Sequence, residues 1–170
     1  HYLGGSGAML TGWQRLGGIW YYLYGSGAMA TGWQYLGGSW YYLDSESGAM
    51  ATGWAQVDGT WYYLDGSGAM LTGWQRLGGT WYYLQGSGAM AEGWQHLGGS
   101  WYYLWPGSGA MATGWIDLDG TWYYLAGSGA MQTGWQWIGN AWYYLDAETG
   151  AMATGWAEID GTWYYLGTSG

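Results

Sequence analysis

The sequence has no cysteine and very few basic side chains. Its 170 residues include two basic side chains against 11 Asp and Glu, which gives a formal net charge of −9. Without cysteine, disulfides and thiolate metal sites are excluded. Because Arg15 and Arg76 are the only strong cations, binding to the phosphate backbone of a nucleic acid is excluded on electrostatic grounds. The acidic surface would instead modestly favour the approach of a cationic ligand.

Signals of a metal site, a membrane segment or an enzyme are also missing. His1 and His96 lie in different sequence contexts and form no histidine cluster. No apolar run approaches the ~20 residues that span a bilayer, and no signal peptide is present, so any secretion signal is expected outside this sequence. The repeats carry equivalent residues, so the sequence has no single cluster that combines an acid, a base and a nucleophile as a catalytic site would. We therefore expect no enzyme activity, no cofactor, no metal and no membrane insertion.

Glycine is abundant, with 37 residues, and such a composition would usually hint at disorder. Disordered segments are poor in aromatic residues, whereas this chain has 18 Trp and 19 Tyr. So many aromatic side chains must be buried or stacked on something. The composition therefore predicts an ordered protein.

The aromatic residues recur in a repeat of 20 or 21 residues. The stretch from Gly73 to Leu84 reads Gly-Trp-Gln-Arg-Leu-Gly-Gly-Thr-Trp-Tyr-Tyr-Leu and returns about eight times, each time followed by a connector of the Ser-Gly-Ala-Met type. Two short apolar runs around a Gly-Gly pair predict two strands joined by a type I′ turn. The extra residue of the longer repeats falls in the connector, which a stack of hairpins tolerates.

The turn determines which side chains share a face of each hairpin. Pairing across the turn places Trp74 opposite Tyr83, and alternation of side chains puts Trp81 on the same face. Leu77 and Leu84 lie on the other face. We expect the first face to form an aromatic box and the second to form the inner spine of the stack. The first tyrosine of each Trp-Tyr-Tyr-Leu run shares the spine face and is expected in the core, as for Tyr21, Tyr41 and Tyr62.

A single hairpin is marginally stable in water, so each repeat needs its neighbours to bury its apolar face. We therefore predict an all-β fold, a repeat solenoid of stacked β-hairpins, with residues 1–170 forming one array. His1-Tyr2-Leu3 reads as the end of a repeat strand and residues 167–170 read as part of a connector, so the array is expected to be truncated at both ends. One variable position on the box face is expected to be exposed: Arg15, Tyr35, Gln56, Arg76, His96, Asp117, Trp137 and Glu158.

The complete pattern is Gly-Trp, an aliphatic residue, the turn, Trp-Tyr-Tyr-Leu and then Gly-Ala-Met-Ala-Thr-Gly-Trp. It resembles the choline-binding repeat, or cell-wall-binding repeat, of Gram-positive surface proteins, pneumococcal autolysins and phage lysins, over essentially the whole chain. The resemblance implies a left-handed superhelix of β-hairpins. It also implies a non-catalytic, extracellular module that binds choline or phosphocholine of teichoic acids and anchors a protein to the cell wall.

In that family a site lies between consecutive hairpins and uses two Trp of one repeat, the second Tyr of the next repeat and the Met that follows it. A quaternary ammonium donates no hydrogen bond, so aromatic faces would recognise it through cation–π contacts of roughly 1–2 kcal/mol each. Carried over by position, the resemblance implies these choline sites: Trp13, Trp20, Tyr42 and Met50; Trp33, Trp40, Tyr63 and Met70; Trp54, Trp61, Tyr83 and Met90; Trp74, Trp81, Tyr103 and Met111; Trp94, Trp101, Tyr124 and Met131; Trp115, Trp122, Tyr144 and Met152; and Trp135, Trp142 and Tyr165.

Two other functions remain open from the sequence. Glucan-binding and toxin-type carbohydrate repeats share the Tyr-Tyr-Phe/Leu hairpin, and sugars also stack on aromatic faces. The second Trp kept in every hairpin, as at Trp20, Trp40 and Trp61, favours choline over a glucan. A purely structural solenoid could instead assemble into filaments through unpaired ends, so end-to-end self-association is also an expectation.

Overall fold

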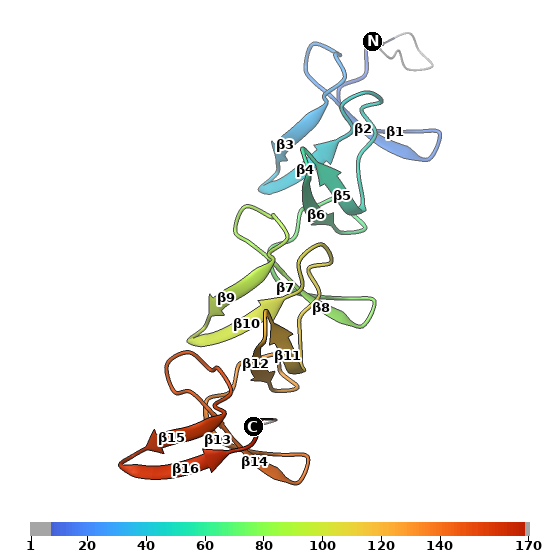
Figure 1. Ribbon diagram of the computed structural model, residues 1–170. Helices are drawn as coiled ribbons and strands as arrows, with labels where there is room; N and C mark the ends of the chain where they lie inside the picture. The colour runs from blue at the N-terminus through green and yellow to red at the C-terminus, as the bar shows by residue number, and fades with distance from the viewer. Residues whose placement is uncertain (1–7, 169–170) are drawn as a thin grey trace. The chain divides into compact units, whose positions relative to one another are not determined.

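The computed structural model describes residues 8–168, in which sixteen short strands and no helix occur. Each odd-numbered strand pairs with the next strand, so the chain is a succession of β-hairpins (Figure 1). The predicted strand end at His1-Tyr2-Leu3 and the last two residues of the predicted connector, 169–170, lie outside the described residues. The strands are β1 (Gly12–Leu16), β2 (Ile19–Leu23), β3 (Gly32–Leu36), β4 (Ser39–Leu43), β5 (Gly53–Val57), β6 (Thr60–Leu64), β7 (Gly73–Leu77), β8 (Thr80–Leu84), β9 (Gly93–Leu97), β10 (Ser100–Leu104), β11 (Gly114–Leu118), β12 (Thr121–Leu125), β13 (Gly134–Ile138), β14 (Ala141–Leu145), β15 (Gly155–Ile159) and β16 (Thr162–Leu166).

The chain divides into two compact units. The first unit extends to Gln75 and includes Tyr83–Met90, and the second contains Arg76–Tyr82 and the chain from Ala91 onward. The contacts described below lie within one unit or the other. The single array predicted for residues 1–170 stays a prediction. Between residues 8 and 168, no helix is long and apolar enough to cross a membrane.

Each hairpin turns through two residues in the left-handed region, as a type I′ turn requires. The φ angles are 60° and 88° at Gly17 and Gly18, and 56° and 70° at Gly139 and Asn140. The strands then pair in the predicted register, with Trp13 opposite Tyr22 in the first hairpin. The same register recurs in the hairpins formed by β3–β4, β5–β6, β9–β10, β11–β12, β13–β14 and β15–β16.

The last leucine of each second strand forms the core of the repeat. Alternation along the strand turns this leucine to the face opposite the two Trp. The predicted inner spine is confirmed at these leucines, whereas the aliphatic residue before each turn varies from half-buried, as at Leu118, to buried, as at Ile159. The fully buried leucines are Leu23, Leu43, Leu64, Leu84, Leu104, Leu125 and Leu145.

The connectors join each hairpin to the hairpin before it. Met131 follows β12, and its backbone N–H donates to the carbonyl of Trp101 on β10 at 2.8 Å, while the next residue, Gln132, donates to Tyr124 on β12 at 2.8 Å. One connector therefore satisfies backbone groups of two successive hairpins, which a lone hairpin would leave to water. The prediction of an all-β repeat solenoid of stacked β-hairpins is confirmed. The same Met-to-Trp bond joins Met50 to Trp20, Met70 to Trp40, Met90 to Trp61, Met111 to Trp81 and Met152 to Trp122.

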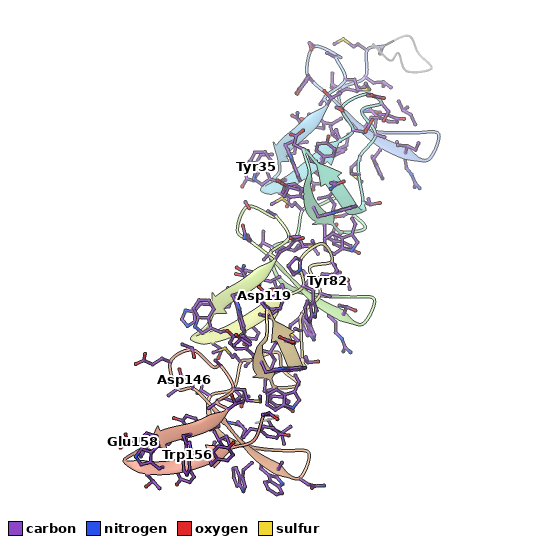
Figure 2. The ribbon with its side chains drawn as sticks, in the orientation of Figure 1. Tyr35, Tyr82, Asp119, Asp146, Trp156 and Glu158 are labelled. Carbon is purple, nitrogen blue, oxygen red and sulfur yellow. The ribbon has the colours of Figure 1, made fainter. Side chains whose placement is uncertain are left out.

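The variable position opposite the second Trp is exposed in every repeat, as predicted. Tyr35 keeps 60% of its surface exposed, and Figure 2 labels it together with Glu158, its equivalent in the last hairpin. Some of these side chains pack, with their rings tilted, against the second Trp of their own hairpin. Ring centroids are 5.0 Å apart for His96 and Trp101. The variable residue can therefore cover part of the second indole.

Candidate functional site

In several hairpins the two Trp form a corner of aromatic surface. In the hairpin of β9 and β10, the rings of Trp94 and Trp101 lie 6.4 Å apart at 88° to each other. They come together because the register places both side chains on one face of the hairpin. Trp101 is about two-fifths exposed, so one wall of the corner remains open to a ligand.

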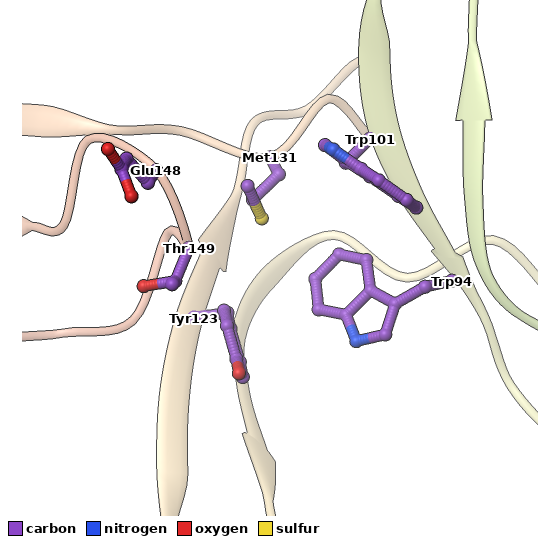
Figure 3. Close-up of a pocket in the computed structure, with 6 residues that line it drawn as sticks. All are labelled: Trp94, Trp101, Tyr123, Met131, Glu148 and Thr149. Atoms are coloured by element: carbon purple, nitrogen blue, oxygen red, sulfur yellow. The ribbon is translucent and has the colours of Figure 1, made fainter.

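This corner becomes a pocket where the next hairpin packs against it. The cavity has a volume of about 270 Å³ and is lined by Trp94, Trp101, Tyr123, Met131, Glu148 and Thr149. We call it the Trp94 pocket. Figure 3 shows the two indoles on one side, Glu148 and Thr149 on the opposite side, and Tyr123 and Met131 between them. All six residues belong to the second unit.

Three further pockets have the same plan and volumes of about 310 to 410 Å³. Each combines two Trp of one hairpin, a tyrosine of the next hairpin, the methionine of the following connector and a residue from the connector after that. They are the Trp13 pocket (Trp13, Trp20, Tyr41, Met50 and Ser67), the Trp33 pocket (Trp33, Trp40, Tyr62, Met70, Gly86 and Ser87) and the Trp115 pocket (Trp115, Trp122, Tyr143, Met152 and Thr168).

The tyrosine that lines each of these pockets differs from the one predicted to bind choline, and the identity of the choline-binding tyrosine stays a prediction. In the Trp94 pocket the expected residue was Tyr124, but Tyr123 lines the cavity, with its ring 5.1 Å from that of Trp94. Tyr124 lies opposite Trp115 in its own hairpin, at 5.1 Å, and so occupies the other face. The first tyrosine, expected in the core, is half-buried and faces the preceding hairpin. Tyr41, Tyr62 and Tyr143 replace the expected Tyr42, Tyr63 and Tyr144 in the same way.

The remaining predicted tyrosines also pack inside their own hairpins. Tyr83 lies 5.3 Å from Trp74, and Tyr103 lies 5.1 Å from Trp94. In the last predicted site, Trp135 is contacted by Tyr164 at 4.9 Å, whereas Tyr165 is two-thirds exposed. The Trp residues predicted for these sites lie where expected on their strands: Trp54 and Trp61, Trp74 and Trp81, and Trp135 and Trp142.

Sequence reasoning missed the connector residues that complete each pocket. Glu148 and Thr149 lie more than two repeats beyond Trp94, and Ser67 lies at a similar separation from Trp13. The repeat pattern shows which positions are equivalent, but by itself it does not show that a connector lies beside a Trp pair more than two repeats earlier. A partial signal exists, because the pocket residue is often the hydroxyl residue that precedes a connector glycine, as at Ser67, Ser87 and Thr149.

An aspartate holds the connector that reaches the Trp94 pocket. Asp146 Oδ1 accepts hydrogen bonds from the Thr149 N–H at 2.8 Å, the Thr149 hydroxyl at 2.7 Å and the Glu148 N–H at 3.1 Å. These bonds, led by the Thr149 N–H, lower the pKa of Asp146 from its ordinary value. Since the pKa is lowered on folding, this contribution to stability is present above the ordinary value and is lost as the pH falls through the lowered one. Two other connectors have an equivalent turn. In one the Ser47 hydroxyl lowers the pKa of Asp44, and in the other the Ser67 hydroxyl lowers the pKa of Asp65.

Glycine is required where a connector passes the methionine of the connector before it. Gly150 has φ = 74°, and a Cβ there would lie 2.5 Å from Met131 Sδ. We expect Gly150→Ala to lower the free energy of unfolding by about 1–2 kcal/mol and to displace Met131 into the Trp94 pocket. The matched control is Gly107→Ala, where φ is also positive at 81° but a Cβ meets no atom within 4 Å. Urea denaturation of the two variants makes the comparison, and equal stabilities would contradict the proposed close approach.

The walls of these pockets suit an organic cation better than a metal. Indole and phenol faces carry negative charge on their π surfaces, and the thioether of methionine is polarizable. For residues 8–168, no group of three or more His, Cys, Asp or Glu side chains could hold a metal ion. The chemistry of the Trp94, Trp13, Trp33 and Trp115 pockets is therefore that of aromatic contact with a ligand.

The sequence and the fold are similar to those of several pneumococcal proteins. The chain is similar to CbpJ from Streptococcus pneumoniae TIGR4, with 43% identity and a TM-score of 0.91 over 95% of this chain and 65% of that chain. It is similar to choline binding protein F from Streptococcus pneumoniae, with 42% identity and a TM-score of 0.88 over 99% of this chain and 67% of that chain. It is also similar to the modular autolysin LytC from Streptococcus pneumoniae, with 34% identity and a TM-score of 0.65 over 96% of this chain and 39% of that chain.

The chain therefore spans about two thirds of the length of CbpJ, and much less of LytC. No curated protein sequence gives a significant match. The choline-binding repeat family matches residues 10–53, 51–92, 71–114, 91–133, 112–155 and 132–170. Because these matches extend over nearly all of the sequence, the chain belongs to the choline-binding repeat family.

Proposed function

We propose that this chain is a non-catalytic module that binds choline groups in its interhairpin pockets. The observation that carries the proposal is the repeated pocket itself, with two near-perpendicular indoles, a tyrosine from the next hairpin and a methionine. Trp94, Trp101, Tyr123 and Met131 form the type example. Membership of the choline-binding repeat family supports the same ligand.

The physical basis is the attraction between a quaternary ammonium and aromatic faces. The trimethylammonium group cannot donate a hydrogen bond, so a pocket needs no polar acceptor to hold it. Each desolvated cation–π contact contributes roughly 1–2 kcal/mol, and the Trp94 pocket offers three aromatic faces. The net charge of −9 also favours the approach of a cation. Together these terms support weak binding at each separate pocket.

Several weak pockets on one chain suit a polymeric ligand. Choline groups repeated along a teichoic acid would engage the pockets in turn, and each engagement would raise the effective concentration for the next. We propose that the chain holds its parent protein at an extracellular cell wall in this way. Choline binding protein F from Streptococcus pneumoniae was solved in the presence of a peptidoglycan analogue, which is consistent with a module that works at the wall.

The test is a titration with choline followed by Trp fluorescence and thermal melting. We expect a saturable fluorescence change at millimolar choline and a rise of several degrees in Tm, because ligand bound to the folded state stabilises it by mass action. The matched control is 3,3-dimethylbutan-1-ol, in which a neutral tert-butyl group replaces the trimethylammonium. It should change neither signal at the same concentration.

Other outcomes would favour the other functions. Equal effects of choline and its neutral analogue would show that the pockets bind apolar groups without regard to charge, which contradicts the proposal. A response to glucan oligosaccharides and none to choline would favour the carbohydrate function. End-to-end self-association stays a prediction, which sedimentation velocity at increasing protein concentration would check.

A further inference from the structure

The Trp94 pocket differs from the other described pockets at its rim. The Trp13 and Trp115 pockets are completed by Ser67 and Thr168, which are neutral. In the Trp33 pocket, Gly86 and Ser87 are neutral too. The Trp94 pocket has a hydroxyl residue, Thr149, but also a carboxylate, Glu148.

Glu148 stands directly before the hydroxyl residue of its connector, the position that Gly86 holds at the Trp33 pocket, but its connector is one residue longer. The chain from Leu145 to Gly150 reads Leu-Asp-Ala-Glu-Thr-Gly, whereas the shorter connector after Leu64 reads Leu-Asp-Gly-Ser-Gly. Asp146 accepts the N–H of Glu148 at 3.1 Å and fixes Thr149 beside it. The Asp146 carboxylate therefore holds the backbone of both Glu148 and Thr149 at the rim of the pocket.

The position of Glu148 is across the cavity from the indoles. Figure 3 shows its side chain and that of Thr149 opposite Trp94 and Trp101. If the ammonium of a ligand lay against the indoles, the rest of the ligand would therefore extend towards the side of the pocket that carries the Glu148 carboxylate. The side chain is exposed, and in water a single charge acts over about one Debye length, roughly 8 Å at physiological salt. That distance is comparable with the size of the ligand.

We propose that Glu148 makes the Trp94 pocket selective for choline over phosphocholine. The carboxylate attracts the ammonium of either ligand. It repels the phosphate of phosphocholine, which carries about −1.5 to −2 charges at neutral pH. The Thr168 hydroxyl at the rim of the Trp115 pocket can instead donate a hydrogen bond to that phosphate. This inference rests on the proposed choline binding and adds a difference in ligand preference between pockets of one chain.

Residue-level titration can test the selectivity within one molecule. The indole N–H signals of Trp101 and Trp122, assigned through Trp→Phe variants, report on the Trp94 and Trp115 pockets in the whole 170-residue chain. Choline and phosphocholine are titrated separately at pH 7.5. We expect the phosphocholine-to-choline Kd ratio to be at least about threefold higher at Trp101 than at Trp122, since an exposed charge pair changes affinity by about two- to fivefold.

Substitutions of Glu148 should remove the difference. Glu148→Gln is expected to weaken choline binding at Trp101 by about two- to fivefold and to bring the two Kd ratios together, and Glu148→Lys should reverse the preference. The matched control is Glu46→Gln. Glu46 lies in an equivalent long connector, with its N–H donating to Asp44 at 3.2 Å, but lines none of the four pockets. It should leave both ratios unchanged.

The two proposals fail in different ways. If choline shifts both indole signals and Glu148→Gln leaves the ratio at Trp101 unchanged, the selectivity is overturned while choline binding stands. If Glu46→Gln changes the ratio as much as Glu148→Gln, the effect belongs to net charge and the role of Glu148 is also overturned. If choline shifts neither indole signal, both the selectivity and the proposed function are wrong.

Discussion

Leu125→Ala is expected to lower the free energy of unfolding by about 3 kcal/mol, within the range for a buried leucine replaced by alanine. Leu125 is fully buried and forms a core cluster with Ala112 and Ile116, against which Trp94 and Tyr123 pack. The loss has two parts, the transfer of the side chain from water and the cavity that its removal leaves. Urea denaturation followed by circular dichroism measures the change.

Leu118→Ala is the control for this substitution. Leu118 packs against the same cluster but is only half-buried, so the same change of side chain should cost about half as much. Equal losses at the two positions would contradict the assignment of Leu125 to the spine. Because the cluster of Leu125 shares Trp94 and Tyr123 with the Trp94 pocket, saturating choline should recover part of the lost stability.

Tyr123→Leu is expected to weaken choline binding at the Trp94 pocket by about tenfold, which corresponds to the loss of one desolvated cation–π contact. Tyr123 lies 5.1 Å from Trp94, across the interface between two hairpins. Leucine keeps an apolar side chain at this interface but removes the aromatic face. The indole N–H signal of Trp101 during a choline titration gives the affinity at this pocket.

The neighbouring residue provides a stringent comparison. Tyr124→Leu makes the same chemical change one position later, where the ring contacts Trp115 inside its own hairpin. We expect it to lower stability and to leave the affinity at the Trp94 pocket unchanged. If Tyr124→Leu weakens binding there and Tyr123→Leu does not, the pocket uses the second tyrosine and the geometry described above is wrong.

The sequence was sufficient to predict the hairpins because their determinants are local. Turn pairs such as Gly139-Asn140 accept the positive φ angles of a type I′ turn. Once the turn is known, the register follows, and alternation then assigns Leu125 to one face and Trp115 to the other. The prediction of an all-β repeat was correct for this reason, as was the placement of the Trp pair on a single face in the hairpins whose register is described.

The composition of the pocket was less predictable because it depends on how one hairpin meets the next. Alternation assigns Tyr123 and Tyr124 to opposite faces but does not say which face contacts the preceding hairpin. The resemblance to the family placed Tyr124 there, and the contacts place Tyr123 instead. Glu148 was missed for a different reason, since its approach depends on the conformation of a connector more than two repeats further along the chain.

Each pocket is built from residues of consecutive repeats, and this has a consequence for evolution by recombination. If the repeat containing β11 and β12 were deleted, Tyr143 and Met152 would take the places of Tyr123 and Met131 beside Trp94 and Trp101. Thr168 would then stand at the rim in place of Glu148. The pocket would survive with a new neighbour and a new electrostatic character. A gain or loss of one repeat would thus reassort ligand preferences along the chain without any point mutation.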